Sequence, residues 1–132
     1  MSERSFLAPL IREPAGRFIL QNTRTRLPVA TTLEAAFDSA SRKKGLLGRD
    51  GLPPGHALII VPTNLVHTFF MRFPIDMLFV RRDGTVAKAR RAVPARRIVG
   101  ALRGYAVIEM GAGELARSDT KGGDRLEVVR AA

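Results

Sequence analysis

Gly and Pro residues interrupt the apolar runs of this chain at close intervals, and this spacing constrains the fold more than any other feature. The 132 residues include 12 Gly and 8 Pro. Short apolar runs bounded by such residues are typical of strands. Strand candidates lie at residues 17–21, 26–31, 56–62, 66–71, 75–80, 105–110 and 125–130, with a further one between Asp83-Gly84 and Pro94. The spacing predicts a mainly β fold, a small β-sandwich or partly open barrel of seven to eight short strands.

Turn residues refine this prediction. Asp83-Gly84 lies between two strand candidates and indicates a hairpin. Pro28 lacks a backbone donor, so the strand at 26–31 is expected at a sheet edge or at a bulge. Gly122, Gly123 and Asp124 predict a turn before the last strand.

The sequence also predicts one helix, over residues 32–44. Thr31 and Glu34 have the spacing of a capping box, and apolar residues follow at helical intervals. Three basic residues precede Gly45, which is placed to end the helix. The helix is expected to plug one end of the β structure or to cover one face.

The domain organisation is expected to be simple. The length suits a single domain, with residues 1–15 as a flexible N-terminal arm and residues 16–132 as one β-rich domain. The first residues have no apolar run of the secretory type, and no run approaches the length of a membrane helix. We therefore expect no membrane span and a cytoplasmic location.

The chain has no cysteine and a strong positive charge. The absence of cysteine excludes disulfides, thiolate metal sites and a cysteine nucleophile. Lys and Arg number 22 against 12 Asp and Glu, a formal net charge of +10. Eight basic residues and one acid lie between Arg81 and Arg103. This 81–103 segment could bind a polyanion such as nucleic acid, but stacking aromatics are scarce there, and a solvated strand face is the favoured interpretation.

The run HTFFMRFPIDMLFV, residues 67–80, places a carboxylate in an apolar strand. Asp76 shares one strand face with apolar neighbours, so it needs a partner if it is buried. Arg72 is close to Asp76 in the sequence, and Arg49 could approach from the Gly-rich loop at residues 45–55. The pair could be an internal ion pair or part of a pocket wall.

Glu109 is a second carboxylate at the end of an apolar strand. Asp76 and Glu109 could act as the acid and base of a hydrolase if their carboxyl groups converge. A metal site built from His67, Asp76 and Glu109 is a weaker alternative, because no histidine has metal-ligand spacing to another. Pairing of Glu109 with an arginine, and a local hydrogen bond for His67, are the favoured interpretations. The sequence predicts no metal and no cofactor.

Other catalytic motifs are missing from the sequence. It has no GxSxG elbow, no P-loop and no dinucleotide fingerprint. The run GLLGRDG lacks the Lys-Ser/Thr ending of a phosphate loop and is expected to follow a helix.

Five runs together resemble the family called domain of unknown function 192, DUF192: GLLGRDGL, HTFFMRFPIDMLFV, DGTV, VIEMGAG and KGGDRLEV. The resemblance covers roughly residues 26–130 and implies a small β-rich, sandwich-like domain. It implies no activity. The family's characteristic residues fall on Gly45, Leu46, Arg49, Met71, Arg72, Pro74, Asp76, Phe79, Glu109, Gly111, Gly113, Gly122 and Asp124. Arg49, Arg72, Asp76 and Glu109 are the polar candidates among them.

These observations favour a binding module over an enzyme. We expect an apolar pocket between the 45–52 loop and the start of the 67–80 run, with a small anionic or polar ligand held by Arg49 and Arg72. His67, Asp76 and Glu109 complete the candidate ligand-binding residues. The alternatives are a hydrolase using Asp76 and Glu109, and polyanion binding through the 81–103 segment. The sequence does not indicate an oligomeric state.

Overall fold

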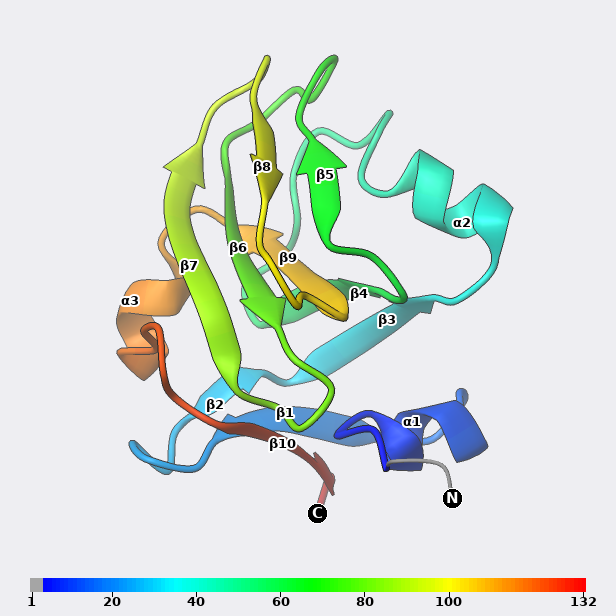
Figure 1. The fold of residues 1–132 in the computed structure, drawn as a ribbon, viewed down its shortest axis with the longest axis vertical. Coiled ribbons are helices and arrows are strands. Elements are labelled where there is room, and N and C mark those ends of the chain that lie inside the picture. Colours follow the sequence, from blue (N-terminus) through cyan, green and yellow to red (C-terminus); the bar gives the residue numbers. More distant parts are fainter. Residues whose placement is uncertain (1–3) are drawn as a thin grey trace.

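A computed structural model describes residues 4–132, over which the chain forms ten strands and three short helices (Figure 1). In chain order the elements are α1 (Ala8–Arg12), β1 (Phe18–Asn22), β2 (Pro28–Ala30), β3 (Thr32–Ala36), α2 (Ser39–Lys44), β4 (His56–Ile60), β5 (Leu65–His67), β6 (Ile75–Val80), β7 (Val86–Val93), β8 (Ile98–Gly100), β9 (Ala106–Gly111), α3 (Glu114–Ser118) and β10 (Leu126–Arg130).

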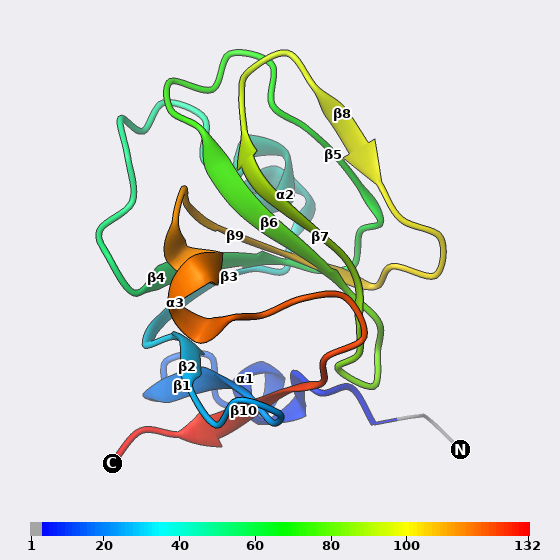
Figure 2. The ribbon, with the colours of Figure 1, turned by 90° about the vertical axis from the view of Figure 1, so that its left-hand side faces the viewer.

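Over the described residues the strands form three sheets and no closed barrel. The orders are β10-β1-β2, β3-β4-β9-β6-β7 and the two-stranded ribbon β5-β8. All neighbours are antiparallel except β3 and β4, which are parallel. The three-stranded sheet lies at one end of the molecule beside α1, and the ribbon reaches to the other end (Figures 1 and 2). The prediction of a mainly β fold is confirmed.

Alternation along the strands divides the interior into two cores. One core fills the space between the three-stranded sheet and one face of the five-stranded sheet. It includes Leu20, Ile59, Leu78, Ile108 and Leu126. Such alternation is expected where each face of a sheet has its own cover.

The second core lies on the opposite face of the five-stranded sheet. Ile60, Met77, Phe79 and Val107 form it, and Val66 from β5 is among the residues that pack against them. The inner side of the β5-β8 ribbon therefore covers this face.

The predicted helix over 32–44 is wrong in its first half and correct in its second. Residues 32–36 form β3, which pairs along its length with β4, so tertiary pairing overrides the helical spacing. The helix begins after Asp38, whose carboxylate accepts a hydrogen bond from Ser41 N at 2.7 Å. It ends at Gly45, as predicted, with φ of 49°.

The described part of the N-terminal segment packs against the first core. Leu10 of α1 and Leu7, just before it, are both buried there. The flexibility of this arm stays a prediction. Residues 1–3 of the expected arm lie outside the described residues.

The turn predictions hold, and the strands expected at 26–31, 56–62 and 66–71 are all shorter than expected. Gly84, with φ of 96°, lies in the β6–β7 hairpin turn, and β2 with Pro28 lies at the edge of its sheet. The strand expected at 66–71 ends at His67, after which Met71 N donates to Thr68 O in a turn. Within residues 4–132, none of the helices combines the length and apolar character that crossing a bilayer requires.

Candidate functional site

A cavity of about 290 Å³ is lined by residues of α2, of the loop after it and of the ribbon strand β5. Its floor is the face of the five-stranded sheet that carries Ile60 and Glu109. The loop after α2 forms one wall, and β5 with Met71 forms the other. Polar groups on an otherwise apolar lining are typical of ligand pockets.

Glu109 is the buried polar group of this cavity. It lies on β9, the central strand of the five-stranded sheet, opposite Met77 of β6 and Leu58 of β4. The residue is 5% exposed. Burial raises the pKa of its carboxyl to about 7, with no hydrogen bond or ion pair from the described residues to offset the loss of water. The arginine partner expected for Glu109 is therefore missing from the described part of the chain.

The Glu109 oxygens face the cavity. Among the described residues, every fully enclosed side-chain nitrogen or oxygen atom has a hydrogen-bond partner. The unpartnered Glu109 oxygens must therefore keep access to the cavity. A buried acid with a displaced pKa at the floor of a pocket is a recognised mark of a functional site.

Gly45 lies beside Glu109 in the lining of the cavity. Its φ of 49° is a backbone conformation that favours glycine, and a Cβ atom built on it would lie 3.9 Å from Glu109 Oε1. Gly45 and Leu46 belong to the GLLGRDGL run, Met71 to HTFFMRFPIDMLFV and Glu109 to VIEMGAG, and all four line the cavity. Three runs far apart in the sequence thus meet at one place.

The rim of the cavity is basic. Arg42, Lys43 and Lys44 from the last turn of α2 line it, and Arg42 also donates a hydrogen bond to Phe37 O. A carboxylate floor beneath a cationic rim gives the cavity two ends of opposite charge. In the sequence these three residues indicate only the C-terminal end of a helix.

Asp76 is buried on the other face of the sheet. It pairs in register with Met110, whereas Glu109 pairs with Met77, so the two carboxylates point to opposite faces. The acid and base pair expected of a hydrolase does not form, because the two groups do not converge. The metal site built from His67, Asp76 and Glu109 does not form for the same reason, because Asp76 lies on the opposite face of the sheet from Glu109.

The partners of Asp76 are backbone amides rather than arginines. Its Oδ1 accepts from Ala92 N at 2.8 Å, and its Oδ2 accepts from Gly113 N and Leu115 N at 3.0 Å each. A carboxylate can accept several such bonds and remain satisfied without a counter-ion. Asp76 therefore ties β6 to the end of β7 and to the start of α3. The prediction of an ion pair between Asp76 and Arg72 or Arg49 is wrong.

Arg49 and Arg72 hold the Gly-rich loop from outside the cavity. Arg49 Nη1 lies 2.8 Å from Glu34 Oε2 on β3, and Arg72 Nη1 lies 3.0 Å from Asp50 Oδ1 in the loop. Neither arginine lines the cavity. The expected pocket is thus close to its predicted place, but its polar groups differ from those expected.

His67 lines the cavity near its mouth. It lies on β5 with its side chain exposed, and its ring centroid is 5.7 Å from that of Phe69. Of the five candidate residues, the structure brings His67 and Glu109 to one cavity and leaves Asp76, Arg49 and Arg72 outside it.

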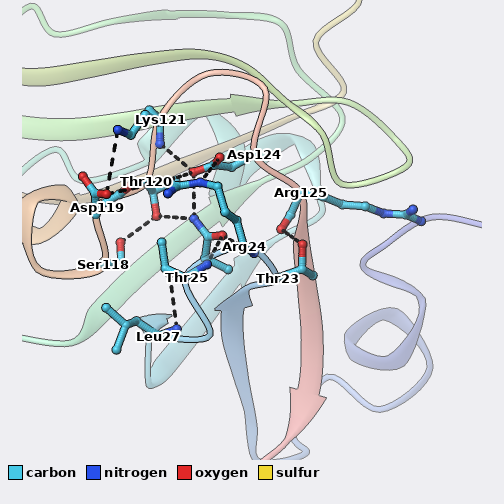
Figure 3. Close-up of polar contacts among 11 residues, drawn as sticks. Thr23, Arg24, Thr25, Leu27, Ser118, Asp119, Thr120, Lys121, Asp124 and Arg125 are labelled. Carbon is cyan, nitrogen blue, oxygen red and sulfur yellow. Dashed lines mark hydrogen bonds and ion pairs between the residues drawn. The ribbon is translucent and has the colours of Figure 1, made fainter.

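Asp124 anchors a separate polar network (Figure 3). Its carboxylate accepts from Arg24 Nε at 2.7 Å, Asn22 Nδ2 at 2.9 Å and Lys121 N at 3.0 Å. Asn22 also donates to Thr120, so the β1–β2 turn is joined to the loop before β10. The hydrogen bond from Arg24 holds the pKa of the Asp124 carboxyl well below its usual range. These partners account for Asp124 as a structural residue.

Most of the basic residues of the 81–103 segment are distributed along β7 and the loops at its two ends. Arg81 and Arg82 lie at the turn before β7, and Arg96 and Arg97 follow its other end. The Arg82 guanidinium stacks over the Tyr105 ring at 4.4 Å. Polyanion binding by this segment stays a prediction.

Comparison with solved structures supports the fold. A crystal structure described as "a putative transcription regulator" from Sinorhizobium meliloti 1021 aligns with a TM-score of 0.73 at 24% identity, covering 84% of this chain and 91% of that chain. A protein of unknown function from Novosphingobium aromaticivorans DSM 12444 aligns with a TM-score of 0.72 at 26% identity, covering 83% of this chain and 82% of that chain. No curated protein matches the sequence.

The family comparison covers most of the same region. Residues 19–128 match the DUF192 family, described as uncharacterized ACR. The match includes every strand from β2 to β9 and the three sequence runs that meet at the cavity. The chain belongs to the DUF192 family.

Proposed function

We propose that this protein is a small-molecule binding module whose ligand is anchored by Glu109. The observation that carries the proposal is a carboxylate, 5% exposed, that lacks a partner among the described residues and opens into a cavity of about 290 Å³. Removing a carboxylate from water is costly unless another group compensates. A ligand that binds in the cavity would supply that group.

The lining indicates the chemistry of the ligand. With a pKa of about 7, the Glu109 carboxyl is divided between its two protonation states at neutral pH. It can accept a hydrogen bond from an ammonium or hydroxyl group, or donate one when protonated. Leu46, Ile60 and Met71 suit a short apolar body. The basic rim suits an anionic group at the outer end.

We therefore infer a small amphiphilic metabolite with an amine or hydroxyl at one end and a carboxylate or phosphate at the other. The volume is at the small end of the range for ligand pockets. A binding role is favoured over hydrolysis because the second carboxylate of the expected pair, Asp76, lies beyond the sheet.

Thermal shift and calorimetry with grouped compounds would test the proposal. The groups are amines, monocarboxylates, amino and hydroxy acids, and sugar phosphates. We expect bifunctional compounds of the amino acid or hydroxy acid type to raise the melting temperature of the wild type. Glu109→Gln should lose most of that rise, and Lys43→Gln with Lys44→Gln should weaken binding of the anionic end.

The matched control is Glu127→Gln, since Glu127 is exposed on β10. This variant should bind as the wild type does. Equal ligand shifts in the wild type and in Glu109→Gln would overturn the role of Glu109. The absence of a shift with every group, together with no small molecule released on denaturing the purified protein, would overturn the binding function.

A further inference from the structure

Large apolar side chains are exposed at the end of the molecule where the ribbon reaches furthest from the three-stranded sheet. The β5–β6 and β7–β8 connections lie side by side at this end in both views (Figures 1 and 2). They carry Phe69, Phe70 and, at the first residue of β8, Ile98. Phe70 is 84% exposed and Ile98 is 67% exposed. We refer to Phe69, Phe70, Arg96, Arg97 and Ile98 as the ribbon tip.

Hydrogen bonds from one buried threonine hold the ribbon tip together. Thr68 Oγ1 donates to Pro94 O at 2.7 Å and accepts from Arg97 N at 2.9 Å. The Thr68 amide donates to Arg97 O at 2.8 Å, and its carbonyl accepts from Met71 N at 3.1 Å. The two connections are thus joined as a single unit, and the apolar side chains project from a fixed base.

Phe70 is not explained by the fold. Its φ of 67° places a bulky residue in the left-handed region, which is strained for a side chain of this kind. The side chain gains almost no burial in return. Glycine would suit this turn position better. Strain held at an exposed residue is a mark of a functional contact.

The ribbon tip itself is positively charged. Arg96 and Arg97 are exposed and form none of the ion pairs found among residues 4–132. Arg72, two residues after Phe70, is paired with the exposed Asp50. Apolar side chains beside unpaired arginines match a partner that is apolar within and anionic at its surface.

We propose that the ribbon tip docks on the surface of an anionic lipid bilayer. Phe70 and Ile98 would enter the boundary between headgroups and acyl chains, and the arginines would contact lipid phosphates. The phosphates of a nucleic acid could bind the arginines. Ile98, however, is aliphatic and has no ring on which a base could stack, so a nucleic acid would not explain its exposure. Protein interfaces are also enriched in Phe and Arg, so binding to a protein, including a second copy of this chain, is a separate outcome of the test. The proposal does not depend on the ligand of the cavity, although His67 and Met71, which line the cavity, adjoin this surface.

Vesicle co-sedimentation of the full chain tests the proposal. The probes are vesicles of phosphatidylcholine alone and vesicles with about one-quarter phosphatidylglycerol. We expect binding to the anionic vesicles only, weakened by salt. Phe70→Gly relieves the strained φ and should keep the fold while reducing vesicle affinity about tenfold. Arg96→Gln with Arg97→Gln should reduce it to a similar extent.

Leu27→Ser is the matched control, because Leu27 is an exposed apolar residue next to β2 in the three-stranded sheet. Its vesicle binding should equal that of the wild type. Failure of the folded wild type to bind anionic vesicles would overturn the proposal, as would equal binding by Phe70→Gly. Dimerisation in solution that Phe70→Gly abolishes, or tight oligonucleotide binding that Phe70→Gly retains without vesicle binding, would assign the surface to another partner and also overturn it.

Discussion

Asp76 and Glu109 occupy neighbouring strands one register position apart and point to opposite faces of the same sheet. Asp76 lies opposite Met110, and Glu109 lies opposite Met77. The first carboxylate is enclosed by three backbone amides, and the second opens into a cavity without a partner among the described residues. Two acids that look equivalent in the sequence therefore have separate roles.

Asp76→Asn should destabilise the protein. The amide nitrogen of Asn would replace one acceptor oxygen and face a backbone donor. We expect the free energy of unfolding to fall by roughly 3 kcal/mol. Urea denaturation of the variant measures this loss. The control is Asp50→Asn at an exposed site, which should change stability by under about 1 kcal/mol. Equal effects of the two substitutions would contradict the structural role of Asp76.

Glu109 should make stability fall as pH rises. Its folded pKa of about 7 lies above the ordinary value of 4.5, so the folded state binds the proton more tightly than the unfolded state. This tighter proton binding contributes fully to the free energy of unfolding below pH 4.5. The contribution, roughly 3 kcal/mol in all, is lost as pH rises through 7. Urea denaturation at several pH values between 5 and 8 measures the loss.

Glu109→Gln removes the titrating group, so the difference in stability between this variant and the wild type should move in favour of the variant as pH rises. Glu127→Gln should follow the wild type at every pH. A constant difference between wild type and Glu109→Gln across this range would contradict the raised pKa.

Asp124→Ala should separate the β1–β2 turn from the loop before β10. The substitution leaves Arg24, Asn22 and the Lys121 amide without their shared acceptor. We expect a loss of about 3 kcal/mol in the free energy of unfolding. Asp119→Ala, in the same loop but more exposed, should cost under about 1 kcal/mol.

Acid should weaken the same network in the wild type. The pKa of Asp124 is lowered in the folded state, so its contribution is present above the ordinary value of 3.8 and is lost as pH falls through the folded value. Thermal denaturation below pH 4 should therefore show a smaller gap between wild type and Asp124→Ala than at pH 6. An unchanged gap would contradict this assignment.

Phe70→Gly should leave stability unchanged or raise it by up to about 1 kcal/mol, because relief of the left-handed φ outweighs the greater freedom of glycine when unfolded. Phe79→Ala is the contrast, since Phe79 is fully buried and its truncation should cost roughly 4 kcal/mol. Chemical denaturation compares them. A clear loss of stability in Phe70→Gly would show that Phe70 supports the fold after all.

Local patterns predicted the strands well because alternation and turn residues act over short distances. The hairpin at Asp83-Gly84 and the edge strand with Pro28 follow from the chemistry of single residues. The segment 32–36 could not be predicted in this way, because β4, its partner, begins at residue 56 and the pairing is parallel.

The sequence predicted only part of the candidate site, because local patterns single out residues but do not show their partners in the fold. Glu109 and His67 could be singled out as polar residues in apolar runs. The sequence did not reveal that Asp76 accepts hydrogen bonds from the backbone of Ala92, Gly113 and Leu115. Nearly every residue type has a backbone amide, so such bonds cannot be predicted from residue types. The sequence indicates only that a helix ends at Arg42, Lys43 and Lys44. Their position at the rim of the cavity depends on the fold.

The pairing of β1 with β10 has a consequence for how the protein is made. Residues 18–22 pair on one edge with the nearby strand β2, but their partner on the other edge lies at residues 126–130, and β9 enters the five-stranded sheet between β4 and β6. Contacts between such distant segments close large loops and slow the search for the native topology. During synthesis, one edge of β1 therefore stays without its strand partner until residues 126–130 have left the ribosome.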